Sequence, residues 1–446
     1  MTFQRHTPIA GMLTVVACAM GPMNITSAPA QAQPVDGWTG SRLLAIADAD
    51  MAATAYANGE LHPIEGSADQ IFLLNPAATE APQRAPASNT VMGWPGSLAV
   101  SADGRYAYVV TSRAQVDRSI EKVDSVFEDV PIAGDLTTVN VETGSVVSVT
   151  KACDKAMSVD VAPSGGWLLV ACGRADGEAA VIPLIDGLPS GAPRVFDLDV
   201  PTYADRAIDA GATYGVIHPG GRAAALVFNN RAVGLVRFDV DAAGAPVAAK
   251  AEDPTETARW LSVARWTRTG RHLIVTDVAW GPRPTDAVFN GRGEILSFAL
   301  APDDPARGIV AAAKVSKSPE AIELNRKGDL LVAVNMERTY LPGGLLSIFR
   351  GRSASSLSLV AVDDATGALR TLGEPLKFRG VLPEDAVFDA DGDRLAVAVF
   401  QDHDAPKSGG WIEFFRIVGA GDARRIEAMD RKIMLPRGVH DLAPID

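Results

Sequence analysis

The feature that most limits what this chain can fold into is a short pattern that occurs six times along the sequence. Each copy has a segment of alternating apolar residues, a tight turn that ends in glycine, and a second segment that is strongly apolar. Alternation with a period of two indicates a β-strand, and a turn that contains glycine joins two such strands as a hairpin. The six copies lie at 98–110, 159–170, 215–228, 263–275, 322–332 and 387–397.

Each copy is followed by two weaker strands, as at 136–141 with 146–149 and at 358–362 with 369–372. Four strands per unit, repeated many times, are typical of a β-propeller, because one small sheet cannot bury its faces until neighbouring sheets stack on it. The 41 glycines and 29 prolines suit many short strands joined by turns. The pattern therefore predicts an all-β propeller.

The two ends of the chain predict how the propeller closes. Residues 439–446 have the pattern of a first strand with nothing after it, and residues 40–47 have that of a second strand with nothing before it. Joined, they complete a seventh unit and remove an exposed sheet edge. We therefore predict a seven-bladed β-propeller. Its closing blade takes the innermost strand from the C-terminus and the outer three strands from the N-terminus.

The start of the chain predicts export. A basic start precedes an apolar run at 9–20, and the small residues at 28–32 provide an Ala-x-Ala site, the order found in secretory signals. Cleavage after Ala32 leaves residues 33–446 as a single propeller in the periplasm or outside the cell. The alternative is a lipoprotein signal with Cys18 as the acylated residue. No later apolar run reaches the roughly 20 residues that cross a bilayer, so no transmembrane segment is expected.

Long connections follow the second strands of four units: about 22 residues after Ala47, about 24 after Thr111, about 14 after Val278 and about 20 after Asn335. In a propeller these connections lie on one face, and loops on a rigid scaffold often carry function. We therefore predict one elaborated mouth and one plain face. Aromatic residues in these connections form a lid, form a partner surface, or simply cover blade edges: Phe127, Trp280, Phe289, Tyr340 and Phe349.

Several segments resemble known propeller families. Residues 101–109 and 389–397 are similar to the bacterial YVTN-type repeats, and residues 359–369 with 383–388 are similar to the lactonase-like seven-bladed family. The resemblance implies this fold and the hydrolysis of a sugar lactone, here a small anionic sugar derivative. Family lactonases typically carry Pro-Arg-His-like residues at the entrance of an inner strand. Here these positions are Pro383-Glu384-Asp385, and Pro319-Glu320-Ala321 one blade earlier.

This departure from the family pattern keeps a second hypothesis open, a non-catalytic binding or scaffold protein. Its partner, a small anionic ligand or another protein, would sit at the face with the long loops. The formal charge of −13 argues against nucleic acid as a partner, because binding to phosphates needs a basic surface.

Two cysteines remain after removal of the signal, Cys153 and Cys172. An exported protein meets an oxidising compartment, and an even pair there suggests a disulfide. Cys153 lies in the link that enters a blade and Cys172 ends the second strand of that blade, so both fall at the same mouth. No close cluster of His or Cys accompanies them, and we expect no metal there.

Four arginines recur just after the second strands of four blades: Arg113, Arg174, Arg231 and Arg338. Guanidinium groups gathered at one mouth could bind a carboxylate or a phosphate, so we assign them to ligand binding. The alternative is that they pair with acids of neighbouring blades.

Acidic and titratable residues stand at the same mouth, at the entrances of inner strands. Glu320, Glu384 and Asp385 could act as general acid and base, or hold Ca²⁺. His440 is a further catalytic candidate and His403 a ligand-binding one. No other cofactor is indicated, because the sequence contains no phosphate-binding loop, nucleophile elbow or zinc-protease motif.

Overall fold

The computed structural model describes residues 34–40, 42–87, 93–174, 177–201, 211–257, 259–281, 283–343, 347–350, 354–403 and 405–445. The predicted signal peptide, residues 1–32, lies outside these residues, and its prediction stays untested. The propeller is therefore described by itself.

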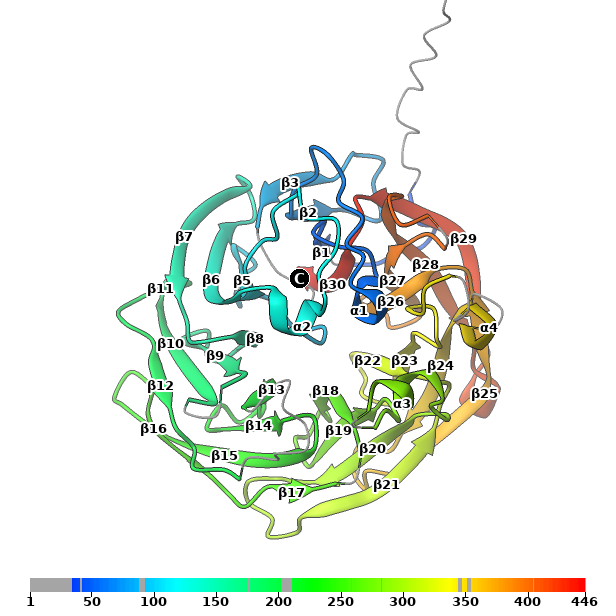
Figure 1. The fold of residues 1–446 in the computed structure, drawn as a ribbon. Helices are drawn as coiled ribbons and strands as arrows, with labels where there is room; N and C mark the ends of the chain where they lie inside the picture. The colour runs from blue at the N-terminus through cyan, green and yellow to red at the C-terminus, as the bar shows by residue number, and fades with distance from the viewer. Residues whose placement is uncertain are drawn as a thin grey trace, which may run out of the picture. The chain divides into compact units, whose positions relative to one another are not determined.

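Seven antiparallel sheets surround a central axis (Figure 1), which confirms the predicted seven-bladed β-propeller. The first blade in chain order contains β4 (Leu98–Val100), β5 (Tyr106–Arg113), β6 (Ile132–Asn140) and β7 (Ser145–Lys151). The second contains β8 (Ala156–Val161), β9 (Trp167–Cys172), β10 (Ala179–Ile185), β11 (Leu188–Pro189) and β12 (Arg194–Phe196). The third contains β13 (Ala212–Ile217), β14 (Ala223–Phe228), β15 (Ala232–Val240), β16 (Pro246–Ala251) and β17 (Thr255–Glu256).

The remaining blades follow the same order from the axis outward. The fourth contains β18 (Leu261–Trp266), β19 (His272–Asp277), β20 (Glu294–Ala299) and β21 (Gly308–Lys314). The fifth contains β22 (Pro319–Leu324), β23 (Leu330–Asn335), β24 (Ser355–Val362) and β25 (Leu369–Phe378). The sixth contains β26 (Val381–Phe388), β27 (Arg394–Gln401), β28 (Gly410–Val418) and β29 (Arg425–Leu435).

The seventh blade closes the ring as predicted. Its strand order is β3 (Gln83–Pro86), β2 (Gln70–Leu74), β1 (Arg42–Ala47) and, next to the axis, β30 (Val439–Ile445). β1 and β30 pair antiparallel from the Arg42–Ile445 pair to the Ala47–Val439 pair. Figure 1 shows the first and the last strand of the propeller, blue β1 and red β30, side by side. The first and the last strand of the propeller are thus hydrogen-bonded to each other in one sheet.

The six repeated turns explain why glycine recurs in the pattern. Their glycines are Gly104, Gly165, Gly221, Gly270, Gly328 and Gly392. All six have φ between 68° and 74°, the left-handed region that other residues adopt only at a cost. The sequence repeat therefore records a backbone requirement of the tight turn between the first two strands.

The core lies between adjacent blades. Leu357 and Leu359 of the fifth blade, for example, pack in one cluster with Phe415 of the sixth. Inner strands are also tied to their neighbours by polar side chains: Asp385 Oδ2 accepts a hydrogen bond from the Leu442 N–H at 2.9 Å, and Ser158 Oγ accepts one from the Gly215 N–H at 3.0 Å. Apolar packing and these bonds together hold the blades in a ring.

The long connections meet on one face, as predicted (Figure 1). Four of them make up what we call the lid: the described residues of the connections 48–69, 114–131, 278–293 and 336–354. They carry the short helices α1 (Ala55–Asn58), α2 (Val126–Asp129), α3 (Pro284–Val288) and α4 (Ser347–Arg350). Residues of all four connections share one apolar cluster, which includes Met51, Val126, Trp280 and Tyr340.

None of the described helices has more than five residues, and so none has the length or the apolar surface needed to cross a membrane.

The disulfide prediction is confirmed. Cys153 and Cys172 are bonded, with their Cα atoms 6.3 Å apart and a sequence separation of 19. The bond joins the link from the first blade to the end of β9, and both residues are buried.

Candidate functional site

A β-bulge recurs near the start of six of the seven inner strands, and it positions the candidate catalytic residues. In β22 the pairing with β23 skips from Pro319 to Ala321, so that Glu320 is the extra residue. In β30 the pairing with β1 likewise leaves out His440. A bulge opposes extra residues on one strand to fewer on its partner, and so changes the direction of a side chain.

The bulge in β26 contains two acids. Pro383 pairs with Val399 and Ala386 with Val397, so that Glu384 and Asp385 both oppose one residue of β27. Asp385 uses one carboxylate oxygen to bind the backbone of β30. Its placement thus supports a structural contact between blades, whereas Glu384 lies close to Glu320 and His440.

Three buried side chains from neighbouring inner strands come together, and we call Glu320, Glu384 and His440 the inner-strand cluster. The fractional exposure of each residue is 5% or less. His440 Nδ1 lies 3.6 Å from Glu384 Oε2. Glu320 Oε2, Glu384 Oε2 and both ring nitrogens of His440 lack a hydrogen-bond partner among the described residues. Buried polar atoms of native proteins are normally bonded to protein, water or a ligand, so this cluster has the features of a ligand-binding site.

Burial controls the protonation of the inner-strand cluster. It raises the pKa of Glu384 well above its usual range, and the nearby Glu320 carboxylate raises it further. Burial also raises the pKa of Glu320, whereas it lowers the pKa of His440 to about 4. A histidine with this pKa is neutral at pH 7, and carboxyl groups with raised pKa values exchange protons closer to neutral pH.

The lid places a tyrosine close to these acids. Tyr56 of α1 is partly exposed as a whole residue, yet burial raises the pKa of its phenol, followed by the charges of Glu384, Glu320 and Asp48. Its ring lies 5.9 Å from that of Phe127 in α2. The two helices thus meet through these rings on the side of the lid that faces the inner-strand cluster.

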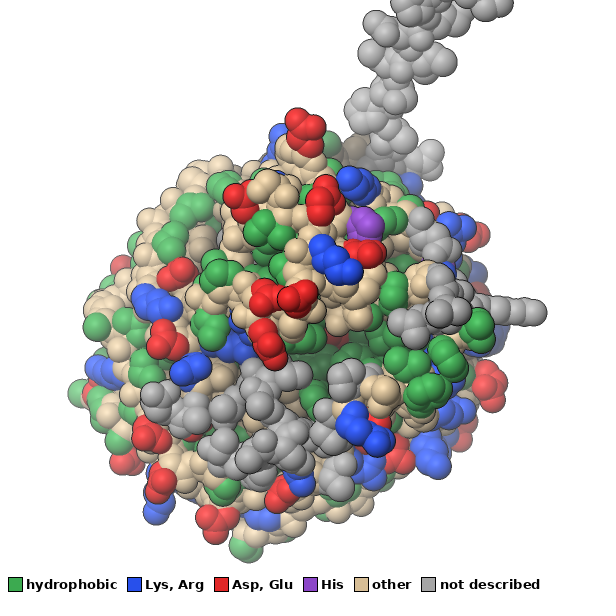
Figure 2. Space-filling model, in the orientation of Figure 1, with side chains coloured by type: hydrophobic (Ala, Val, Ile, Leu, Met, Phe, Trp, Pro, Cys, Tyr) green, Lys and Arg blue, Asp and Glu red, His purple; other side chains and the backbone are tan. Residues whose placement is uncertain are grey.

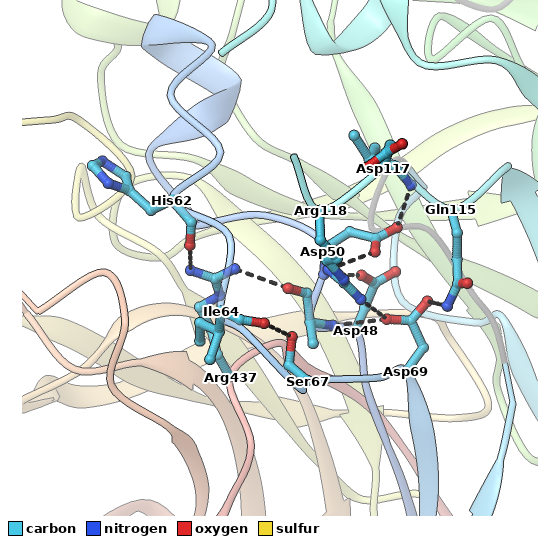
Figure 3. A network of polar contacts seen from close by, with 12 residues as sticks. Asp48, Asp50, His62, Ile64, Ser67, Asp69, Gln115, Asp117, Arg118 and Arg437 are labelled. Atoms are coloured by element: carbon cyan, nitrogen blue, oxygen red, sulfur yellow. Dashed lines mark hydrogen bonds and ion pairs between the residues drawn. The ribbon is translucent and has the colours of Figure 1, made fainter. Parts of the chain in front are cut away.

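A second group of acids, which the sequence analysis missed, lies beside the first. Asp48 and Asp50 follow β1 and Asp69 precedes β2, at the two ends of one lid connection. We call these three residues the carboxylate cluster; all are buried, and one oxygen from each lies within 4.8 Å of the others. Figure 3 shows their carboxylates pointing toward one another. The Asp-x-Asp spacing directly after a buried strand was the available signal in the sequence.

Two residues of the carboxylate cluster, Asp48 and Asp50, also have raised pKa values. Burial raises the pKa of Asp48 well above its usual range, and the charges of Asp69 and Asp50 raise it further. The same causes, burial and then Asp69, raise the pKa of Asp50 to about 7. Arg118 lowers both values, because its Nη1 lies 2.8 Å from Asp50 Oδ1.

The four predicted ligand-binding arginines are not gathered around either cluster. Arg113 donates to the carbonyl oxygens of Val130 at 2.7 Å and Phe127 at 2.6 Å, and so holds one lid connection. Arg231 is paired with Glu256 at 2.7 Å.

The other arginines and the predicted ligand-binding histidine have separate environments. Arg338 donates to the side chain and the backbone of Asn290, at 3.0 and 2.7 Å. Arg174 is exposed and lines a cavity of about 350 Å³ beside the disulfide. His403 is buried just after β27, and its backbone N–H donates to Asp402 Oδ1 at 2.7 Å.

The lid leaves a hollow at the mouth. Figure 2 shows this hollow in the centre of the lid face, with hydrophobic side chains along part of its wall. A cavity of about 660 Å³ lies elsewhere, between the short turns of the plain face, and is lined by His218, Arg222 and Arg271 among others. We place the candidate site at the mouth, because the buried proton-binding groups are there and not among the exposed arginines of the plain face.

The sequence matches no family model and no curated protein sequence, so membership of a YVTN family is not confirmed. Solved structures do match the fold. A candidate 6-phosphogluconolactonase from Bacteroides fragilis has a TM-score of 0.58 at 13% identity, covering 91% of this chain and 98% of its own.

Two further solved structures match the fold. A candidate 6-phosphogluconolactonase from Bacteroides uniformis has a TM-score of 0.56 at 15% identity, covering 91% of this chain and 100% of its own. A hypothetical selenium-binding protein from Sulfolobus tokodaii has a TM-score of 0.55 at 10% identity, covering 91% and 94%. At these identities the likeness shows the fold alone, a seven-bladed β-propeller.

Proposed function

We propose that the protein is a hydrolase that opens a small cyclic ester, a sugar lactone, at the inner-strand cluster. The observation that carries this proposal is the set of buried, unbonded proton-binding atoms on Glu320, Glu384 and His440. Two carboxyl groups with raised pKa values can supply one general base and one general acid at a pH near neutrality. The fold of the two candidate 6-phosphogluconolactonases is consistent with this reaction class.

The reaction needs only water and these groups. One carboxylate of the Glu320–Glu384 pair removes a proton from water while the water oxygen bonds to the lactone carbonyl carbon. The bond between that carbon and the ring oxygen then breaks, and the second carboxyl group gives its proton to the ring oxygen. The product is the open hydroxy acid. Neutral His440 Nδ1 lies 3.6 Å from Glu384 Oε2, and His440 helps to orient the carboxyl group of Glu384.

The surroundings favour an uncharged lactone over the anionic sugar derivative that the sequence analysis suggested. Arg113, Arg231 and Arg338 bind groups of the protein itself, while the neighbouring groups are carboxyls. An anionic substrate would meet like charges in a buried site, which weakens binding. Hydroxyl groups of a neutral sugar can instead donate hydrogen bonds to the carboxyl oxygens.

The experiment compares lactones that differ in charge. The chain from residue 33 onward is incubated with glucono-δ-lactone or with its 6-phosphate, and acid release is followed with a pH indicator. We expect faster turnover of the neutral lactone, and a loss of about 100-fold or more in kcat for Glu384→Gln, in the range of general acid–base catalysis. Glu374→Gln is the control, because Glu374 is exposed on β25.

The outcomes separate the hypotheses. No turnover of either lactone by the folded protein contradicts the hydrolase. Binding of a lactone without turnover, detected as a rise in Tm, supports the non-catalytic binding protein instead. Faster turnover of the phosphorylated lactone restores the anionic substrate.

We also propose that the protein works after export, in the periplasm or outside the cell. The disulfide between Cys153 and Cys172 supports this proposal, because such bonds persist mainly in oxidising compartments. Cell fractionation with an antibody to the propeller tests it.

A further inference from the structure

The carboxylate cluster has the geometry of a cation site. One oxygen from each of Asp48, Asp50 and Asp69 lies within 4.8 Å of the others. Oxygens that share a Ca²⁺ ion lie about 2.3–2.6 Å from it, so that two of them can be separated by up to about 5 Å. All three carboxylates are hard oxygen ligands, and Figure 3 shows them facing a common region.

A second observation points to a missing ligand. Asp48 is fully buried, and its Oδ2 accepts no hydrogen bond from the described residues. Its other oxygen accepts the Asp50 N–H at 3.0 Å. Asp48 therefore presents an unbonded, buried carboxylate oxygen within the cluster, and such an atom is costly to bury unless a cation or a donor binds it.

The other contacts hold the cluster in shape without completing it. Asp69 accepts the Ala49 N–H at 3.0 Å through Oδ1 and the Gln115 side chain at 2.9 Å through Oδ2. Asp50 Oδ2 accepts the Val116 N–H at 3.2 Å. Because these donors come from two lid connections, the three carboxylates are fixed relative to one another before any ion arrives.

Fewer positive charges than carboxyl groups are in contact within the cluster. Arg118 contacts Asp50 at 2.8 Å and Asp69 at 3.5 Å, and its side chain is 28% exposed. Arg437 is buried, but it donates to the carbonyl oxygens of His62, Pro406 and Ala49, and not to the carboxylates. One guanidinium group, in contact with two of the three carboxyl groups, would not balance the charge of all three once a cation displaces their protons.

We propose that Asp48, Asp50 and Asp69 bind a Ca²⁺ ion, which joins the lid connection 48–69 to the connection 114–131. The ion replaces part of the contact that Arg118 makes with Asp50 and Asp69. Its expected effect is to hold the lid over the mouth. The site is separate from the inner-strand cluster, and its existence does not depend on hydrolysis.

The test measures binding of Ca²⁺ alone. The protein from residue 33 onward is treated with a chelator, dialysed and titrated with CaCl₂ by isothermal calorimetry. We expect one ion per chain and a rise in Tm with Ca²⁺, because a ligand that binds only the folded state stabilises it. Asp48→Asn should weaken binding at least tenfold, and Asp69→Asn serves as a second variant if the first does not fold.

Two matched variants sharpen the test. Arg118→Gln should bind Ca²⁺ more tightly, since it removes the competing cation, whereas a purely structural role of Arg118 would only lower Tm. Asp117→Asn should bind as the unmodified protein does, because Asp117 is exposed in the same connection and outside the cluster. Absence of Ca²⁺ binding by the folded protein overturns the proposal. Equal binding by Asp48→Asn, or tighter binding of Mg²⁺ than of Ca²⁺, does the same.

Discussion

At the scale of single residues, the chemistry of the mouth depends on which residue occupies the recurring β-bulge of each inner strand. The bulged residue is Met157 in the second blade and Thr213 in the third, whereas it is Glu320 in the fifth, Glu384 with Asp385 in the sixth and His440 in the seventh. The same backbone device thus serves packing in some blades and gathers titratable groups in three consecutive ones.

One consequence concerns the pH dependence of stability. The pKa of Glu384 is raised in the folded state, so the folded chain binds more protons than the unfolded chain above about pH 4.5. The free energy of unfolding that this group contributes is therefore present at low pH and lost as pH rises through the folded pKa. Glu384→Gln should lose this dependence, so that its stability relative to the unmodified protein increases from pH 5 to pH 9.

Urea unfolding at pH 5, 7 and 9 checks this prediction. His440 has the opposite effect, because its lowered pKa removes stability as pH falls from about 6.5 to about 4, but it is present in both proteins. Parallel pH profiles for the two proteins would contradict the raised pKa. Glu374→Gln, exposed on β25, should give the profile of the unmodified protein.

At the scale of elements, the connections between strands differ sharply in what holds them. The lid connections share an apolar cluster that includes Leu61, Val130 and Leu341. The rings of Phe289 and Phe349 instead meet edge to face, with centroids 5.0 Å apart, and stay exposed at 64% and 38%. The link before β8 is instead tied by the disulfide to the end of β9. One element of the mouth is thus covalently restrained, whereas the lid is held by packing and by hydrogen bonds such as those of Arg113.

The disulfide should stabilise the fold by restricting the unfolded chain. For a bridge that spans 19 residues, the chain-entropy relation gives about 3 kcal/mol. We expect the double variant Cys153→Ala with Cys172→Ala to lose about this free energy of unfolding in urea. A reducing agent should destabilise the unmodified protein by a similar amount and leave the variant unchanged. If the variant unfolds at the same urea concentration as the oxidised protein, the expectation is wrong.

At the scale of the whole molecule, stability depends on how the last strand joins the ring. β30 pairs with β1 within the closing blade, and its Asp441 is bonded to the first blade, which is the next one around the ring. Its Oδ2 accepts the Gly96 N–H at 2.9 Å, the Ser97 hydroxyl at 2.8 Å and the Leu98 N–H at 3.0 Å. A single carboxylate oxygen thus links the closing blade to the blade that follows it.

Removing this link should loosen the closure. Asp441→Ala leaves buried donors of the first blade without an acceptor, which costs about 1–3 kcal/mol for each buried group. We expect a total loss of about 3 kcal/mol in the free energy of unfolding, together with faster hydrogen exchange in β4 and β30. Asp391→Ala, at an exposed turn position, is the control. Unchanged exchange in β30 would show that its pairing with β1 alone closes the ring.

The number of blades, their closure, the side of the long connections and the disulfide could all be predicted from the sequence. Each of these depends on local signals: alternation of apolar residues within a strand, glycine at a tight turn, and the spacing of two cysteines. Propeller blades also contact mainly their neighbours in sequence, so the repeat translates almost directly into the arrangement of sheets.

Only the tertiary structure decided which side chains meet at the mouth. A bulge of one residue changes the direction of the Glu320 or His440 side chain. The alternation of apolar residues along a strand does not predict where such a bulge occurs. Arg338 and Asn290 come from different blades, and Asp69 meets Asp48 only when the lid connection folds back. Partner choice for charged groups depends on such long-range contacts and on burial, and neither is encoded by spacing along the chain.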